Sequence, residues 1–571
     1  MTAKITPLKQ AIEAFVEPGM SLYFACAHTR PTAATMEVCR RFRGMDPGFE
    51  VGARGFVAPM HALVHLGLAS RIVTSFVGEI YPRPQPNPTY SRGVATGLEI
   101  EHWSLLTLVQ RLLAGACGLP WITTRSLVGS SMAADLSRAG KAMPGPDGTL
   151  LVRALTPDIA FVHAAAADEH GNALVPPPYG EGVYAALAAR VGAIVTAERI
   201  VSTSRLRTNS QDVLLPGFKV LSVSEVPFGA HPWGMSHGLP DLPAYADDYA
   251  FIEGAAVAAR APKTLDGWLD DWVLTGSHET YLDRLGEARL RELEARARVV
   301  PGETRPTDPG HEPPTQIEAM ATAAAEVVAE RAQRGGHDRL LAGIGIGNLA
   351  AWLAARILAE RGVDIALIAE IGMFGYEPAL GDPFIFSAAN IPSAVHLSDV
   401  LGILGSLLGP TRADNGGTLG VLGAAEIDPA GNVNSTLSGG ALLVGSGGAN
   451  DVASAAAEVV VCIEHGRDRL VPEVEYVTSP GLRVRAVVTT RAVFEREGEA
   501  EPFRLTRVVG AGPATIPGSD TVREILATCG WEVETARELG SLRPDPQLLG
   551  LLRAFDPQGH FTGRRSAPGS S

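Results

Sequence analysis

The 571-residue chain has few cysteines, few aromatic residues and little charge. Aromatic residues make up 6% of the sequence and charged residues 19%, and there are five cysteines. The cysteines are odd in number and scattered without a C-x-x-C pair, so neither a disulfide framework nor a thiolate metal site is expected. The sequence therefore predicts reduced thiols, a cytoplasmic location and no bound metal.

Long hydrophobic runs are also missing. No uninterrupted apolar run reaches the roughly 18 residues that a membrane helix needs, and the N-terminal residues lack the layout of a secretion signal. The net charge of −14 argues against nucleic acid or an anionic membrane as the main partner. A small anionic ligand stays compatible with this charge, because local arginines and helix N-termini bind phosphates on acidic proteins too.

What the chain does contain is a regular alternation of strand-like and helix-like segments in two halves. This alternation predicts an α/β fold with parallel sheets. Five prolines within residues 301–314 indicate a linker, and Thr315 with Glu318 forms a capping-box pattern just after it. The expected division is a first domain over 1–297, a linker over 298–316, a second domain over 317–563 and a disordered tail over 564–571.

An internal repeat supports this division. Ile159–Asn172 and Leu419–Asn432 each read as an apolar strand that ends in Asp-x-x-Gly-Asn. Each is followed by a further apolar strand, so the similarity extends beyond the turn. The repeat predicts two similar open α/β domains in tandem, with a cleft between them.

One acidic residue stands at the end of a predicted buried strand in the second half. The apolar run Ile365–Ala369 leads directly to Glu370, and the chain then turns through Gly372 and Gly375. Ligands of open α/β sheets bind beyond the carboxyl ends of the strands, and glycines let the backbone approach a ligand closely. Glu370 is therefore a candidate catalytic nucleophile that both halves would face, and a solvated loop carboxylate or a helix N-cap partner is the alternative at this point.

The glycine-rich stretch over residues 343–348 follows another predicted strand and opens a helix. Its backbone N–H groups are suited to bind an anion. It also matches a dinucleotide fingerprint formed by Gly345, Gly347 and Ala350, for which Asp364 or Glu370 would be the ribose-binding acid. A nicotinamide-dependent enzyme is therefore an alternative at this point.

Several ordered stretches in both halves resemble the class I CoA-transferases, most closely the glutaconate CoA-transferase branch. The first half is similar to the α subunit of that branch over residues 55–60, 99–130 and 158–172. The second half is similar to the β subunit over residues 369–378, 419–436, 445–454 and 474–481. The chain thus resembles an α–β fusion, and the similarity spans most of both halves.

The resemblance implies a fold, a reaction and a nucleophile. Glu370 falls on the glutamate that attacks an acyl-CoA thioester and then carries CoA as a glutamyl thioester, which an acceptor carboxylic acid takes up. Coenzyme A would be a substrate, with no separate cofactor, and relatives pair two αβ units, which here would be a homodimer. Relatives on the same fold are ring-opening CoA-thioester hydrolases or decarboxylases, so these activities are the alternative. A function outside the enzymes, that of a non-catalytic acyl-CoA-binding protein, is a further alternative.

Further site residues are predicted in the same way. Ile371 stands where the family usually has Asn or Ser, so a side-chain donor is missing there. A hydrolase would need a general base, for which Glu101, and Glu99 near it, are the candidates. The proline-rich segment 79–92 is expected to be a loop. Backbone donors for an oxyanion or for CoA are expected at Gly372, Gly375, Gly445, Gly447 and Gly448, and the candidates for binding a carboxylate or the CoA phosphates are Arg83, Arg92 and Arg125.

Overall fold

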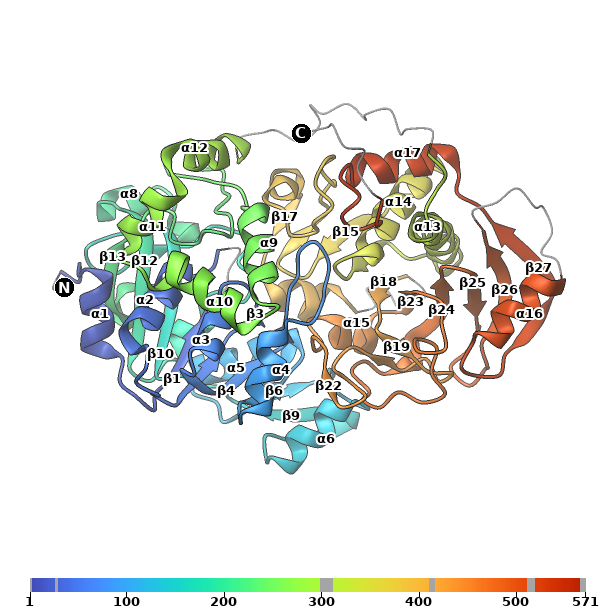
Figure 1. Ribbon diagram of the computed structural model, residues 1–571, viewed down its shortest axis with the longest axis horizontal. Helices are drawn as coiled ribbons and strands as arrows, with labels where there is room; N and C mark the ends of the chain where they lie inside the picture. The colour runs from blue at the N-terminus through green and yellow to red at the C-terminus, as the bar shows by residue number, and fades with distance from the viewer. Residues whose placement is uncertain (1–2, 26–28, 298–311, 410–415, 511–518, 565–571) are drawn as a thin grey trace.

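The protein consists of two α/β halves that lie side by side (Figure 1), the first coloured blue to green and the second yellow to red. The structure is a computed structural model, and it describes residues 3–25, 29–297, 312–409, 416–510 and 519–564. Most of the predicted linker and nearly all of the predicted tail lie outside these residues, so the exact domain boundaries stay predictions.

The first half is built on an eight-stranded sheet in which all neighbours except β11 are parallel. Successive residues of its strands pack on opposite faces: Phe24 and Phe161 belong to one apolar cluster, and Tyr23 and Ala160 to another. Helices cover both faces, which explains why these strands are apolar on both sides. The strand order is β13 (Val220–Glu225), β12 (Gly192–Ile200), β10 (Ile159–Ala167), β1 (Ser21–Phe24), β2 (Phe49–Gly52), β4 (Ala69–Thr74) and β6 (Glu99–His102), with β11 (Ala173–Leu174) beside β10. The covering helices include α1 (Leu8–Phe15) and α2 (Thr32–Phe42) on one face and α5 (Leu105–Ala116) and α7 (Tyr184–Ala188) on the other.

The second half repeats this plan and extends it. Its ten-stranded sheet contains β15, β14, β18, β23 and β24 in the spatial order that β2, β1, β10, β12 and β13 have in the first sheet. The predicted tandem of similar α/β domains is therefore confirmed. The strands run β17 (His396–Leu397), β16 (Met373–Phe374), β15 (Ala366–Ala369), β14 (Arg339–Ala342), β18 (Thr418–Gly423), β23 (Glu458–Ile463), β24 (Val484–Thr489), β25 (Ala492–Glu495), β26 (Arg504–Val509) and β27 (Glu534–Leu542). The main helices are α13 (Gln316–Gly335), α14 (Ile346–Glu360), α15 (Ala449–Ala455), α16 (Ser519–Ala527) and α17 (Pro546–Phe555).

Smaller elements complete the two halves. The remaining helices are α3 (His61–His65), α4 (Pro88–Ala95), α6 (Ser131–Arg138), α8 (Thr203–Arg207), α9 (Tyr249–Ala258), α10 (Pro262–Leu269), α11 (His278–Leu285) and α12 (Glu287–Arg296). The remaining short strands are β3 (Gly55–Phe56), β5 (Phe76–Val77), β7 (Trp121–Thr124), β8 (Ala142–Pro144), β9 (Leu150–Arg153), β19 (Glu426–Ile427), β20 (Val433–Asn434), β21 (Leu437–Ser438) and β22 (Ala441–Leu442).

Two local expectations have opposite outcomes. The capping box is confirmed, because the Thr315 and Glu318 side chains each accept the other residue's backbone N–H at the start of α13. The expectation that all of 79–92 is loop is wrong. Asn87 caps α4 by accepting the Thr89 amide, and Pro88 occupies the first helical position, where the N–H that proline lacks has no helical partner anyway.

The repeated Asp-x-x-Gly-Asn turns are equivalent in detail. Asp168 accepts the backbone and side-chain N–H groups of Asn172 at 2.9 and 2.8 Å, and the Asn172 side-chain oxygen accepts the Gly217 amide at 2.9 Å. Asp428 accepts the same two groups of Asn432 at 2.9 and 3.0 Å. The Asn432 side-chain oxygen accepts the amide of the glycine just before β24 at 3.0 Å. Each turn thus ties two neighbouring strand connections together.

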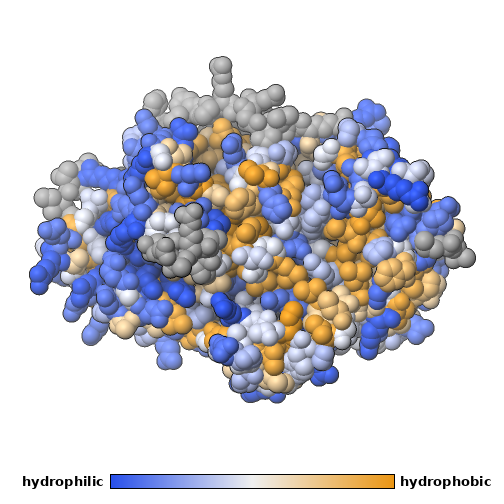
Figure 2. Space-filling model, turned by 180° about the vertical axis from the view of Figure 1, so that it is seen from behind, coloured by the Kyte–Doolittle hydropathy of each residue, from blue (hydrophilic) through white to orange (hydrophobic). Residues whose placement is uncertain are grey.

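Figure 2 shows the molecule from behind. Apolar residues gather over the centre of this face and toward the right, where the first half lies, and the left side is mostly hydrophilic. Within the described part of the chain no helix is both long and apolar enough to cross a membrane. Four cysteines fall in described residues and are unpaired.

We expect Asn172→Ala and Asn432→Ala to destabilise the protein by similar amounts. Each change leaves a glycine amide and an aspartate without their asparagine partner, which costs about 1–3 kcal/mol in the free energy of unfolding. Urea unfolding measures the effect. Asn209→Ala, which removes a half-buried contact with the Arg205 side chain, serves as the control and should change stability much less. Equal effects of all three substitutions would contradict the structural role of the turns.

Candidate active site

A cavity of about 600 Å³ lies where the two halves meet. Its walls come from the carboxyl ends of strands in both sheets, which is where open α/β folds bind ligands. The predicted cleft between the halves is therefore present. The strand-end residues in its lining are Arg54 after β2, Ser75 after β4, Gly343 after β14, Glu370 after β15, Gly423 at the end of β18 and Ile463 at the end of β23.

Glu370 lies in this lining, next to the glycine-rich turn that precedes α15. Glu370 Oε2 lies against the Gly448 backbone, and the Gly448 amide acts to lower the pKa of the carboxylate. A Cβ atom at Gly448 would collide with Glu370 Oε2, so glycine is the residue that permits this approach. The end of β15 and the Gly445–Gly448 turn, which are far apart in sequence, thus form one site.

The pKa of Glu370 is raised to about 7. Burial is the main cause, because it disfavours the charged form. Arg54 and the Gly448 amide act in the opposite direction, and the carboxylate of Asp451 adds to the increase. The side chain keeps partial exposure toward the cavity. At neutral pH the site therefore holds a poorly hydrated carboxylate that is partly ionised.

Asp451 and Asn450, at the start of α15, anchor the Gly445–Gly448 turn through hydrogen bonds to both halves. Asp451 accepts the Leu106 amide of the first half at 2.9 Å, and burial raises its own pKa to about 6. Asn450 accepts the Leu127 amide at 2.8 Å and donates to the Thr478 carbonyl at 2.8 Å. Asp451 is thus the second acid near Glu370. Its stretch resembles the family, but no local pattern in the sequence indicates this role.

The glycines predicted as backbone donors divide into two groups. Gly445 and Gly447 line the cavity with Glu370, but their amides donate to the Ser435 and Ser75 carbonyls, both at 2.9 Å. Gly372 and Gly375 lie outside the lining. The Gly372 and Gly375 amides donate to backbone carbonyls of β15 at 3.0 and 2.8 Å, and positive φ angles of 121° and 64° account for glycine there. Of the five, Gly448 is the one whose amide meets Glu370.

Ile371 does not face the cavity. Its side chain is 1% exposed and belongs to the main apolar cluster of the second half, and its carbonyl accepts the Gly180 amide at 2.9 Å. The departure from Asn or Ser at this position therefore removes no donor from the cavity wall of this structure.

Glu101 is held in a separate ion cluster rather than in the cavity. It pairs with Arg71 and Lys141, lies 3.5 Å from Arg111 and accepts the Trp103 indole N–H at 2.8 Å. Burial alone would raise its pKa, but Arg111, Lys141 and Trp103 together lower it. A carboxylate with these partners does not meet substrate in the cavity, so the structure does not bring Glu101 to Glu370.

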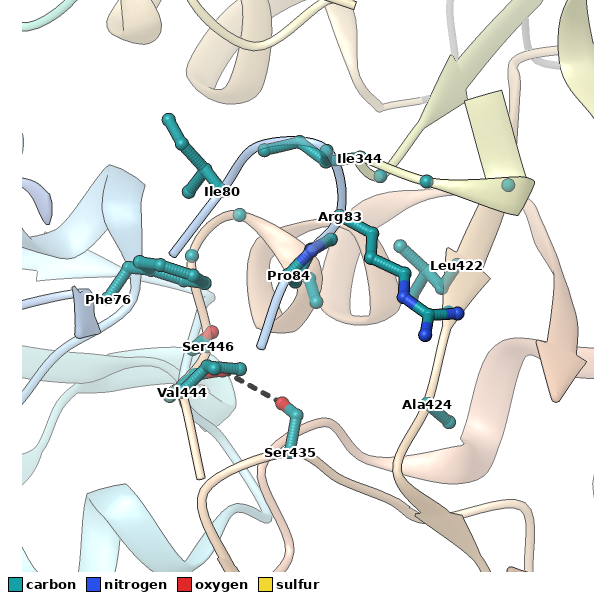
Figure 3. A pocket seen from close by; sticks show the side chains of 18 of the residues that line it. Phe76, Ile80, Arg83, Pro84, Ile344, Leu422, Ala424, Ser435, Val444 and Ser446 are labelled. Atoms are coloured by element: carbon teal, nitrogen blue, oxygen red, sulfur yellow. Dashed lines mark hydrogen bonds between the residues drawn. The ribbon is translucent and has the colours of Figure 1, made fainter. Parts of the chain in front are cut away.

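The three predicted arginines are also separated. Arg83 lines the cavity, and in Figure 3 its side chain extends from a first-half loop toward Leu422 and Ala424. Among the described residues, Arg83 forms no hydrogen bond or ion pair. Arg92 instead binds the Ala259 carbonyl at 2.9 Å, and Arg125 is exposed; neither lines the cavity. Arg54 does line the cavity, although the sequence pattern does not single it out.

The glycine-rich loop between β14 and α14 follows a strand and opens a helix, as predicted. Gly345 and Gly347 line the same cavity as Glu370, whereas Asp364 is exposed and lies outside the lining. The loop therefore contributes to the wall near Glu370. Of the two acids considered for a dinucleotide site, Asp364 lies outside the cavity lining and Glu370 lies within it.

A family model for coenzyme A transferases matches residues 5–225 and 414–504, one stretch in each half. The chain belongs to the coenzyme A transferase family. It is 29% identical over 280 residues to one of the two subunits of 3-oxoadipate CoA-transferase from Pseudomonas knackmussii, covering 48% of this chain and 94% of that one. It is 27% identical over 235 residues to the other subunit of the same enzyme, covering 38% and 85%.

The solved structure of an acyl-CoA transferase, YdiF, from Escherichia coli O157:H7 has the same fold. It superposes with a TM-score of 0.66 at 16% identity, over 96% of both chains. The family matches in both halves and the similarity to two separate subunits of one enzyme identify the protein as a CoA-transferase family enzyme in which both subunits are fused in one chain.

We expect Glu370→Gln to stabilise the protein more at pH 8 than at pH 5. The folded pKa of about 7 lies above the ordinary value of 4.5, so the wild type loses stability as the pH rises from about 4.5 to about 7. The variant has no carboxylate to ionise, and its advantage should grow by about 1–3 kcal/mol over that range. Melting temperatures at both pH values measure this difference. Glu377→Gln, at an exposed position, is the control, and a pH-independent difference for Glu370→Gln would contradict the raised pKa.

Proposed function

We propose that this enzyme transfers coenzyme A from an acyl-CoA to a carboxylic acid through a covalent glutamyl-CoA intermediate at Glu370. The observation that carries the proposal is the position of the carboxylate in the cavity between the halves, against the Gly448 amide and near Arg54. Coenzyme A enters and leaves as part of the substrates, so the proposed reaction uses no separate cofactor.

In the first step a carboxylate oxygen of Glu370 attacks the thioester carbonyl carbon. The C–S bond breaks, CoA leaves as a thiolate and an acyl–glutamyl anhydride remains. The thiolate then attacks the glutamyl carbonyl, which releases the first carboxylic acid and forms the glutamyl thioester. An acceptor carboxylate attacks this thioester and repeats the two steps in reverse. Splitting one acyl exchange in this way is the general advantage of a covalent nucleophile.

The electrostatics of the site suit these steps. Burial leaves the Glu370 carboxylate poorly hydrated, so attack requires little loss of bound water. Arg54 and the Gly448 amide keep part of it ionised against the effect of burial and of Asp451. The same two groups are placed to stabilise negative charge that moves between the carboxylate and the thioester oxygen.

The hydrolase alternative receives less support from this arrangement. It needs a base that activates water near the thioester, and Glu101, the predicted base, is bound in its own ion cluster outside the cavity lining. Transfer requires no such base, because the acceptor carboxylate is itself the nucleophile.

Intact and peptide mass spectrometry after incubation with acyl-CoA, without an acceptor acid, tests the proposal. We expect a CoA-sized adduct on the peptide that contains Glu370, absent in Glu370→Gln. Adduct formation should become faster as the pH rises through about 7, because the ionised carboxylate is the nucleophile. Release of free CoA without an adduct would favour hydrolysis. Unimpaired turnover by Glu370→Gln would exclude the glutamate as nucleophile.

We also propose that Arg83 binds the phosphate groups of CoA. Its exposed guanidinium lines the cavity at the carboxyl end of β18. Arg83→Ala should raise KM for acyl-CoA about tenfold with a smaller change in kcat, since one charge-assisted pair contributes roughly 1.5–3 kcal/mol. Steady-state kinetics at two ionic strengths provide the test. Arg125→Ala, outside the cavity, should behave like the wild type; an equal effect of both would refute the assignment.

The predicted homodimer stays a prediction, which sedimentation of the full chain would test.

A further inference from the structure

One end of the cavity is apolar and closed by aromatic side chains. Val57, Phe76, Ile80, Ile344 and Phe386 line it there, and they belong to one cluster of packed hydrophobic residues drawn from both halves. We call these five residues the apolar chamber. Val57 and Ile80 are 1% and 7% exposed, so the chamber wall is part of the protein core.

A second layer of aromatic side chains holds the chamber rigid. Tyr81 stacks on Tyr249 with ring centroids 3.9 Å apart, and Phe384 meets both rings edge-on. The Tyr249 hydroxyl donates to Asp382 at 2.7 Å, and the Trp233 indole donates to the Ala58 carbonyl at 2.8 Å. The Tyr249 hydroxyl and the Trp233 indole are therefore engaged within the protein rather than directed to a ligand.

The charged groups around the chamber are likewise engaged. Arg30 lies with its guanidinium 5.0 Å above the Trp233 ring and donates to the Gly55 carbonyl at 3.1 Å. Asp382 accepts from Ser387 and Tyr249, and Asp247 accepts the Gly234 amide. Asp247 is buried behind the chamber, where burial raises its pKa to about 7, and Asp382 is half-buried.

The opposite end of the cavity is exposed and charged. Arg83 extends toward Leu422 and Ala424 (Figure 3). Arg469, whose side chain is 43% exposed, donates to the Ala425 carbonyl at 3.2 Å and lies 3.7 Å from Asp468, and Glu464 also lines the cavity. Anionic CoA phosphates fit this end and not the apolar one. Phe76 of the chamber pairs with Gly445 in an antiparallel bridge, so the chamber begins beside the turn that contacts Glu370.

From this arrangement, and resting on the proposed function, we infer that the chamber holds the acyl group and that the preferred acyl groups are apolar. Straight-chain, branched or cyclic groups of medium size fit this chemistry. A dicarboxylic acyl group would have to bury its second carboxylate among aromatic rings, where the lining cation Arg30 is already engaged by the Trp233 ring and the Gly55 carbonyl. A buried charge without full pairing is strongly unfavourable. This expectation differs from the dicarboxylic 3-oxoadipate that names two of the relatives.

The test compares adduct formation on Glu370 with hexanoyl-CoA, cyclohexanecarbonyl-CoA, succinyl-CoA and glutaryl-CoA. The wild type should react with the two apolar thioesters at least about tenfold faster than with the two dicarboxylic ones. Ile344→Asn should reduce this ratio by about tenfold, because it places an amide in the chamber wall. Val257→Asn, on the exposed face of α9, is the matched control and should leave the ratio unchanged.

In the kinetic comparison, two results would overturn the inference: a wild type that prefers succinyl-CoA or glutaryl-CoA, or an Ile344→Asn variant that slows all four thioesters equally. The comparison of the four thioesters with the wild type tests the inference even if the Ile344→Asn variant does not fold. Calorimetry of hexanoyl-CoA and glutaryl-CoA binding to the Glu370→Gln variant tests the chamber independently of the proposed reaction. Tighter binding of hexanoyl-CoA than of glutaryl-CoA, with no adduct in the wild type, would support the chamber and refute the nucleophile. Equal binding would refute the chamber.

Discussion

A carboxylate held away from bulk water at the junction of two sheets is the constraint on which this site depends. Glu370 leaves the end of β15 and meets the backbone of the turn before α15 so closely that a Cβ atom at position 448 would displace its carboxylate. Burial and Asp451 favour its neutral form, and Arg54 and the Gly448 amide favour the ionised one. The buried carboxylate costs folding stability as it ionises, because its pKa in the folded protein lies above the ordinary value.

The internal duplication explains why this junction exists. β2 and β15 occupy the same place in the two sheets, and the residues that follow them have diverged. The first half supplies a cation there, Arg54, and the second half supplies the acid, Glu370. Because both strands end at the cavity, the repeat brings two opposite charges to one site from two similar frameworks. The repeated Asp-x-x-Gly-Asn turns, which lie elsewhere in each half, kept the same hydrogen bonds and so preserve the framework.

The cavity is asymmetric along its length, and both halves contribute to that asymmetry. The first-half segment that carries Ile80 and Arg83 supplies an apolar wall residue at one end and a cation at the other. Tyr81, between them in sequence, is anchored by stacking on Tyr249 and by contact with Phe384 of the second half. A substrate with an anionic carrier and an apolar acyl group would match this layout from end to end.

The sequence by itself determined the strand that ends in Glu370, the glycine-rich turns, the capping box at Thr315 and the duplicated plan. These features follow from local periodicity, turn chemistry and the sterics of glycine, which act over a few residues. The family resemblance added the role expected of Glu370.

Only the tertiary structure decided which candidates share a site. Asp451 accepts the Leu106 amide, which lies 345 positions earlier in the sequence. Glu101 instead forms ion pairs outside the cavity, with Arg71, Arg111 and Lys141. Gly372 and Gly375 serve the backbone of β15, and Arg83 alone among the three predicted arginines lines the cavity. The burial and the pairing of a charge depend on packing between distant segments, and no local pattern in the chain encodes that packing.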